Sequence, residues 1–180
     1  MSFVRNLYDW VLSWANKPSG PVALGAMSMA EASFFPIPPD VLLIPLALGK
    51  REKAWYFGLI CSVCSILGAA LGYGIGFWVW WVEPNVFSSF AQFFFDHIPG
   101  FTYEAFETIK SLYDEYNFLL ILSAGFTPIP FKLFTISAGA FNIQFPMFIL
   151  AGTVSRSARF FLVAFLIKTY GFSEHDARIK

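Results

Sequence analysis

Five ionisable side chains stand inside or beside long apolar stretches of this 180-residue sequence: Glu31, Asp40, Lys132, Arg156 and Arg159. An ionisable group at membrane depth costs roughly 2.5 to 3.5 kcal/mol on insertion scales, so each needs a partner or a function. Arginine and lysine bind phosphate, and partly desolvated carboxylates can exchange protons. The set therefore predicts a site for a phosphate or lipid headgroup. The three cations would face the anion, while Glu31 and Asp40 would couple its movement to protons.

Three other interpretations of these residues stay open. The five groups could pair among themselves as buried salt bridges that only hold the structure together. Buried pairs stabilise poorly relative to apolar replacements, however, so five such groups favour a further role. The same carboxylates also suit a proton- or cation-coupled transporter or channel for small solutes, and a structural or assembly role is a further alternative.

Catalysis has little support in the sequence. His97 and His175 fall in segments expected on opposite sides of a membrane, and there is no H-E-x-x-H, P-loop or Gly-x-Ser-x-Gly motif. Cys61 and Cys64 lie in an apolar run, where small packing residues are a better interpretation than a redox pair. We therefore predict no enzyme, no catalytic residue, no metal site and no cofactor.

The composition indicates the elements that must position the five charges. Hydrophobic residues make up 57% of the chain and charged residues 13%, against roughly 25% charged residues in soluble domains. The 23 phenylalanines are more than a small soluble body can bury. This excludes an ordinary soluble domain, a disordered chain and a disulfide-stapled module, and predicts an all-α integral membrane protein. The net charge of zero gives no argument for nucleic-acid binding.

Apolar stretches and loops divide this single membrane domain into seven segments. They are an interfacial helix (1–20), a re-entrant hairpin (21–49), a transmembrane helix (54–82), an extracytoplasmic amphipathic region (83–117), a second re-entrant hairpin (118–141), a second transmembrane helix (145–169) and a cytoplasmic tail (170–180).

Prolines are expected to break both hairpins, because proline removes a backbone donor and clashes with the preceding turn. Pro36 and Pro38 lie in the first hairpin, with the break expected over 33–39, and Pro128 and Pro130 lie in the second. Each half is then too short to cross a bilayer of roughly 30 Å. Broken backbone at membrane depth survives only inside protein or beside a wet cavity.

Two features mark the segment 54–82. Gly68, Gly72 and Gly76 give a doubled small-xxx-small spacing that lets another helix approach closely, either within the fold or in a homo-oligomer. Three tryptophans near its end are interpreted as an interfacial aromatic anchor: Trp78, Trp80 and Trp81.

The two proline segments match each other about half the chain apart. Phe-Pro-Ile-Pro-Pro-Asp (35–40) aligns with Thr-Pro-Ile-Pro-Phe-Lys (127–132), which pairs Asp40 with Lys132 and could place the two across a shared cavity. One full span per half turns the second copy over, so we predict an inverted repeat. The basic loop 50–53 and the tail then lie inside and the acidic region 83–117 outside, as the positive-inside rule requires.

Three motifs carry a family resemblance. They are Glu31-x-x-x-x-Pro36-x-Pro38-x-Asp40, the run Phe-Thr-Pro-Ile-Pro-Phe-Lys at 126–132, and the pair Arg156 and Arg159. Over about residues 22–170 the chain resembles the DedA family, also called VTT-domain or SNARE-associated membrane proteins, in its YqaA-like branch.

The resemblance implies a protein of the bacterial inner membrane, and the distribution of basic residues predicts a multi-pass protein with both termini in the cytoplasm. It further implies movement of a polyprenyl-phosphate carrier or a phospholipid across that membrane, coupled to the proton motive force. The acidic pair of the family falls on Glu31 and Asp40, and the basic pair falls on Arg156 and Arg159. Membrane lipids are thus the expected partners.

Overall fold

The computed structural model of the chain is mostly helical. It describes residues 17–35, 37–83, 86–98, 102–116, 118–124, 126 and 130–170, without the side chains of Asp114 and Phe118. The expected interfacial helix (1–20) and cytoplasmic tail (170–180) lie almost entirely outside the described residues.

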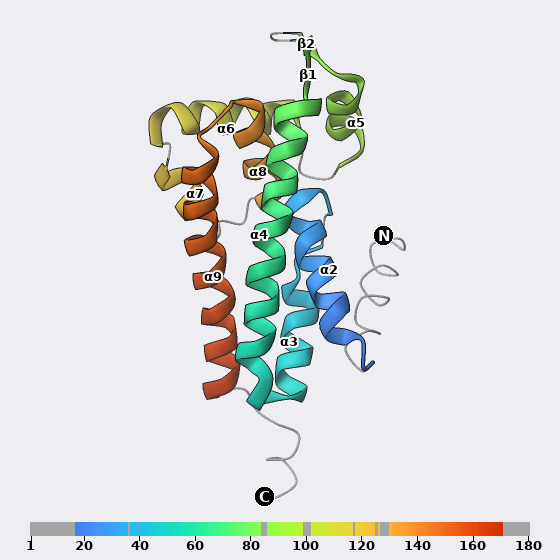
Figure 1. The fold of residues 1–180 in the computed structure, drawn as a ribbon, viewed down its shortest axis with the longest axis vertical. Helices are drawn as coiled ribbons and strands as arrows, with labels where there is room; N and C mark the ends of the chain where they lie inside the picture. The colour runs from blue at the N-terminus through green and yellow to red at the C-terminus, as the bar shows by residue number, and fades with distance from the viewer. Residues whose placement is uncertain are drawn as a thin grey trace, which may run out of the picture.

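Two long helices, α4 (Ala54–Val79) and α9 (Phe145–Tyr170), run side by side along the whole bundle (Figure 1). Each has 26 residues, which at 1.5 Å per residue gives a length of about 39 Å. Both are long and apolar enough to cross a membrane. Their outward faces carry large apolar side chains, among them Leu67 on α4 and Leu150 on α9.

The first hairpin consists of α2 (Gly20–Ser33) and α3 (Asp40–Gly49). The helix is interrupted over 34–39, on the stretch where the prolines were expected to break it. Pro38 lies in this interruption, whereas Pro36 is outside the described residues. The chain then reaches α4 through the short 3-10 helix η1 (Arg51–Lys53).

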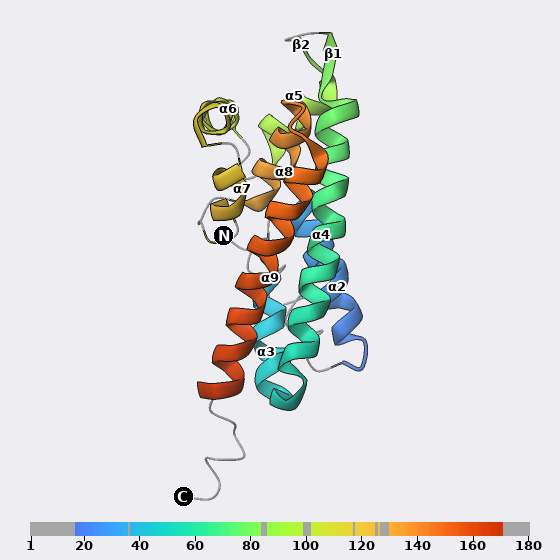
Figure 2. The same cartoon turned by 60° about the vertical axis from the view of Figure 1, so that its left-hand side comes forward.

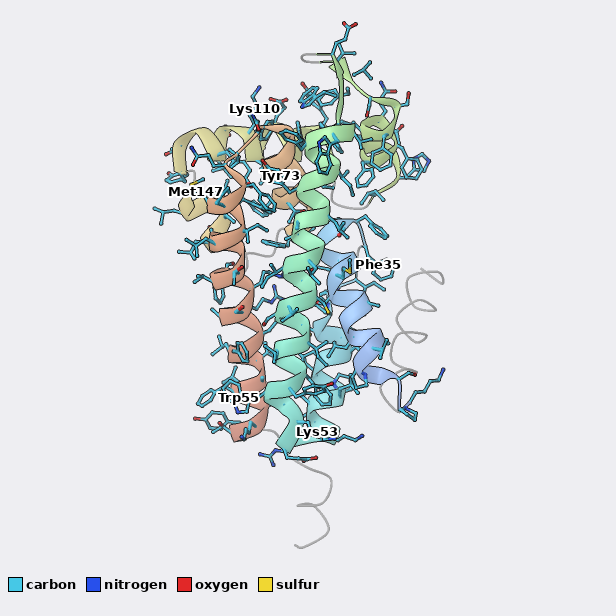
Figure 3. All side chains as sticks on the ribbon, viewed as in Figure 1. Phe35, Lys53, Trp55, Tyr73, Lys110 and Met147 are labelled. Carbon is cyan, nitrogen blue, oxygen red and sulfur yellow. The ribbon has the colours of Figure 1, made fainter. Side chains whose placement is uncertain are left out.

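The turn of this hairpin lies well inside the bundle. Both halves extend from the same end, where α3 joins η1 (Figures 1 and 2). Phe35, at the turn, lies partway between Lys53 at one end and Lys110 at the other (Figure 3). The first residues after the break and the last residues before it are therefore held at depth in the bundle.

The second hairpin, α7 (Phe118–Ala124) and α8 (Phe131–Ala140), occupies the opposite part of the bundle (Figure 1). Pro130 immediately precedes α8, and Pro128 lies outside the described residues. Asn142 adopts a positive φ of 55° after α8, the left-handed conformation that ends helices. The amide of Ile143 then donates to the carbonyl of Ala138 at 2.9 Å, and the chain turns into α9.

The glycines of α4 bring both hairpins against this helix. A Cβ at Gly68 would overlap the backbone of Met29 in α2, and one at Gly76 would overlap the backbone of Ile136 in α8. Between them, Gly72 faces both Ala32 and Thr135. The predicted close helix approach is confirmed, and it serves the internal fold.

A cap of short elements covers the end of the bundle beyond α4. It consists of the antiparallel strands β1 (Trp81–Glu83) and β2 (Val86–Phe87), followed by α5 (Ser89–His97) and α6 (Tyr103–Tyr116). Helix α6 lies across the bundle axis and is seen end-on in Figure 2. Ser88 joins cap and bundle, because its hydroxyl donates to the carbonyl of Val79 at 2.6 Å and accepts from the amide of Ala91 at 3.1 Å.

Two expectations about this region are wrong in part. The segment 54–82 is not one helix, since α4 ends at Val79 and a strand follows. The proline at position 84 disfavours helical backbone just before it, and β-branched Val82 suits a strand. The region 83–117 is accordingly not purely helical.

The tryptophan anchor also needs correction. Trp78 is highly exposed, as an interfacial anchor would be, but Trp80 is completely buried. Its ring stacks on Phe106 with centroids 5.4 Å apart and meets Phe94 edge-on. The indole of Trp81 donates to the carbonyl of Ala140 at 3.0 Å. These two tryptophans hold the cap onto the bundle.

Helix α6 packs on α8 through a buried tyrosine. The hydroxyl of Tyr113 donates to the carbonyl of Phe134 at 2.8 Å. Burial raises the pKa of Tyr113, so the hydroxyl stays a neutral donor. This contact fixes the cap directly above the helix that begins with the second proline segment.

Candidate functional site

Glu31 and Arg156 form an ion pair in the interior of the bundle. Glu31 lies in the last turn of α2, and Arg156 lies near the middle of α9. The Nη2 atom of Arg156 donates to the Oε2 atom of Glu31 at 2.5 Å. A charged pair at this depth forms only because the broken helix brings α2 to an end beside the intact helix α9.

The guanidinium of Arg156 has hydrogen-bond partners along its edge and aromatic rings against its faces. Its Nε atom donates to the hydroxyl of Ser65 on α4 at 2.7 Å. The rings of Phe131 and Phe160 lie 4.6 and 4.8 Å from the guanidinium carbon, in range for cation–π attraction. Arg156 is 2% exposed, so the group is fixed in one orientation.

Asp40 and Arg159 form a second pair nearer the surface. Asp40 is the first residue of α3, and the Nη2 atom of Arg159 donates to its Oδ2 atom. The side chains of Arg159 and Asp40 are 30% and 17% exposed. Arg156 and Arg159 are three residues apart and therefore share one face of α9. This face meets both sides of the first proline break.

Lys132 is the predicted site residue for which the structure provides no hydrogen-bond partner. It lies in the first turn of α8 and is 1% exposed. Among the described residues, nothing accepts a hydrogen bond from its Nζ atom. The charge of Glu31 acts on its ammonium. Asp40, which was expected on the other side of a shared cavity from Lys132, binds Arg159.

Hydroxyl groups link the two hairpins and α4 near these charges. Thr135 on α8 donates to the carbonyl of Ala32 in α2 at 2.9 Å. Ser33 donates to the carbonyl of Gly68 on α4 at 2.8 Å. The carbonyls at a helix C-terminus lack partners within the helix. A neighbouring hydroxyl therefore lets α2 end inside the bundle without leaving Ala32 unsatisfied.

Sequence reasoning missed three residues that contact Arg156. Ser65 carried a signal, because a small polar residue in an apolar helix often marks an interhelical hydrogen bond. Phe131 belongs to the run 126–132, but nothing in that run marks its ring as a contact of an arginine, and Phe160 carried no signal among 23 phenylalanines. The predicted carboxylates and arginines, by contrast, do meet, and they do so at the first proline break.

The site as a whole contains three cationic and two anionic side chains. Both carboxylates are engaged by arginines, and one oxygen of Asp40 and the ammonium of Lys132 have no hydrogen-bond partner among the described residues. An uncompensated buried cation is costly. The arrangement can therefore accept one further negative charge.

Relatives of the chain are known, although no family profile and no solved structure match it. It is 35% identical over 181 residues to an uncharacterized protein of Haemophilus influenzae, covering 100% of this chain and 88% of that protein. It is 37% identical over 167 residues to a Histophilus somni protein described as an uncharacterized protein HI0703 homolog, covering 92% of this chain and 82% of that protein. The chain therefore belongs to the same protein family as these Haemophilus and Histophilus proteins.

Proposed function

We propose that the protein is an integral membrane protein of the DedA type that moves a lipid with an anionic phosphate headgroup across the bacterial inner membrane. The observation that carries this proposal is the buried ammonium of Lys132. It has no hydrogen-bond partner in the described part of the chain, and the carboxylate whose charge acts on it, Glu31, is already paired with Arg156. A phosphate would supply the missing negative charge and acceptor oxygens.

The proposed placement in the membrane has α4 and α9 crossing it and the two hairpins entering from opposite sides as an inverted repeat. The ends of the bundle differ in charge in the way this requires. Arg51 donates to the carbonyl of Lys168 at 2.9 Å, which gathers basic residues at the end where α4 begins. The cap at the other end carries acidic residues such as Glu104 and Glu107. Basic residues favour the cytoplasmic side.

Carboxylates paired to arginines offer a route for proton coupling. A phosphate that binds Arg156 or Arg159 competes with Glu31 or Asp40 for the same guanidinium donors. A carboxylate displaced at this depth loses its counter-charge, which favours its protonation. Binding of the headgroup and uptake of a proton would then be linked, and release of the headgroup would restore the ion pair.

The cation-coupled transporter is the weaker alternative because of the sign of the site. Pathways for cations are lined by an excess of carboxylates, whereas the described site has more cationic than anionic side chains. The proton-coupled transport of a small anion shares the chemistry of the proposal, and the experiment below separates it from lipid movement.

A reconstituted system tests this function. Purified protein in liposomes is assayed for movement of fluorescent phosphatidylglycerol between leaflets, with and without a pH gradient. A charge-assisted hydrogen bond contributes about 1.5–3 kcal/mol, so the Lys132→Met variant should lose at least about tenfold in rate. Lys132→Arg should retain most of the activity, because it keeps the charge.

Lys110→Met is the matched control, since Lys110 is an exposed lysine on the cap. It should move lipid at the wild-type rate. Wild-type rates in Lys132→Met would contradict the site, and ion or phosphate flux without lipid movement would contradict the lipid cargo.

A further inference from the structure

An open groove, the cap groove, lies between the two strands and helix α6. It has a volume of about 760 Å³, within the range of roughly 300–1,000 Å³ that small-molecule sites occupy. Lys110, on its wall, lies at the cap end of the bundle, whereas Phe35, at the turn of the first hairpin, lies at mid-depth (Figure 3). The groove shares no described residue with the charged site. Aromatic and charged side chains on its wall include Trp81, Glu83, Phe87, Tyr103, Glu107 and Lys110.

Three aromatic rings on this wall are held in place by the fold itself. Trp81 and Phe87 are partners across the two strands, and their rings stack with centroids 4.6 Å apart. The indole N–H of Trp81 donates to the carbonyl of Ala140 at 3.0 Å, which fixes the plane of the ring. The ring of Tyr103 stands nearly perpendicular to that of Phe87, with centroids 5.9 Å apart. A ligand therefore finds the aromatic wall already ordered, which lowers the entropy cost of binding.

The charged side chains on the wall leave an excess of negative charge. Glu83 ends β1, and Glu107 lies on α6 between Tyr103 and Lys110. Residues 103, 107 and 110 are four and three positions apart, so they share one face of the helix. Lys110 offsets the charge of one carboxylate. Neither Glu83 nor Glu107 takes part in an ion pair among the residues that the structure describes, so both carboxylates can act on a ligand.

We infer that the cap groove binds a small molecule that carries an organic ammonium group. Aromatic rings attract cations to the negative faces of their π systems, and several rings together recognise quaternary ammonium groups. The two carboxylates supply the opposite charge that such a group needs, and they disfavour an anion. The inference goes beyond the proposed function and does not depend on it, because the groove and the charged site share no described residue.

A metal ion fits the cap groove less well than an organic cation. A hard cation such as Ca²⁺ takes about six to eight oxygen ligands. In the part of the chain that the structure describes, no three aspartate, glutamate, histidine or cysteine side chains gather closely enough to hold a metal ion. Aromatic rings offer no ligand atom to a hard cation, whereas the carbons of an organic ammonium group pack directly against them.

Choline and dimethylbutanol, its neutral analogue with carbon in place of nitrogen, test the inference. Their binding to the purified protein in phosphatidylglycerol nanodiscs is measured by isothermal titration calorimetry, with empty nanodiscs as the blank. We expect choline to bind, and the analogue, which has the same shape without the charge, to bind at least about tenfold more weakly.

Replacing part of the phosphatidylglycerol by phosphatidylcholine separates two sources of the ammonium group. Weaker choline binding in these nanodiscs would show that a lipid headgroup enters the groove, and unchanged binding would show that the ligand is a soluble molecule.

Variants on α6 test the charges and the ring one at a time. Glu107→Gln should weaken choline binding at least about fivefold, and Tyr103→Leu should weaken it about two- to fivefold. Lys110→Met should strengthen it about two- to fivefold, because the lysine repels the ligand. A gain of affinity cannot come from a damaged fold. Glu104→Gln, at an exposed position of α6 outside the groove, is the control and should bind choline as the wild type does.

Four results would each overturn the inference. They are equal binding of choline and its neutral analogue, wild-type affinity in Glu107→Gln, weaker binding by Lys110→Met, and displacement of choline by an equal concentration of Ca²⁺.

Discussion

The two hairpins contact α4 in the same way but bring opposite charges to it. The first hairpin packs Met29 against Gly68, and the second packs Ile136 against Gly76. At the breaks, the first hairpin presents carboxylates with arginine partners, whereas the second presents Lys132, whose ammonium has no hydrogen-bond partner among the residues that the structure describes.

This difference separates packing from function. Close contact at a glycine requires that the backbone of the partner helix reach it, and both hairpins meet that requirement. Nothing in the packing requires a lysine at the start of α8, where a buried ammonium costs free energy. The shared feature thus belongs to the scaffold, and the unshared feature belongs to the chemistry of the site.

The largest expected effect comes from Arg156→Met, which removes the partner of Glu31. Breaking one side of a buried ion pair costs about 3–5 kcal/mol of unfolding free energy. Chemical unfolding in mixed micelles measures the loss. Adding Glu31→Gln to this variant should recover part of the stability, because the stranded carboxylate is gone. A double variant that is no more stable than Arg156→Met would show that the pair is not coupled.

Alanine at Gly68 and at Gly76 tests whether both hairpins pack against α4 in the same way. Gly68→Ala and Gly76→Ala each force a Cβ onto backbone, and overpacking of this kind typically costs about 1–3 kcal/mol. The two losses, measured by thermal unfolding, should be similar. Gly49→Ala is the control, because a Cβ there meets nothing within 4 Å. A loss of stability at only one of the two glycines would show that the two hairpins do not pack against α4 in the same way.

Lys132→Met should raise stability while it removes function. A buried donor without a partner costs about 1–3 kcal/mol, and more when it is charged, so an apolar side chain of similar length should increase the unfolding free energy by about that amount. The same unfolding experiment checks it. A loss of stability in this variant would mean that Lys132 is structurally compensated and that the second hairpin is not poised for a ligand.

The smallest expected effect is that of Asp40→Asn. Its pair with Arg159 is partly exposed, and solvent-exposed ion pairs contribute about 0–1 kcal/mol. Stability should therefore hardly change, whereas any proton coupling that uses Asp40 should be lost. Lipid movement that still responds to a pH gradient in this variant would assign the coupling to Glu31.

The sequence predicted the scaffold better than the site. Proline positions indicated the interruption at 34–39, and the spacing of Gly68, Gly72 and Gly76 indicated the close approach of other helices. Both are local signals with one physical meaning. The pairing of Asp40 with Arg159 depends on how α3 and α9 meet. No local sequence pattern contains that contact.

The cap was predicted least well for a related reason. The pattern of its aromatic residues fits a layer on the membrane surface as well as a protein core, because each of these environments buries one face of each ring. The place of Trp80 at the end of an apolar run favours an interfacial anchor. Only the folding of α5 and α6 over it decides that it is buried.

The hydrogen bond from Thr135 in α8 to Ala32 in the last turn of α2 joins the two hairpins. The two hairpins and the glycine face of α4 therefore form one connected block. A transport cycle that keeps this block intact has to act through the remaining long helix. Helix α9 carries both arginines, so rocking of this helix against a stationary block would loosen both ion pairs in a single movement.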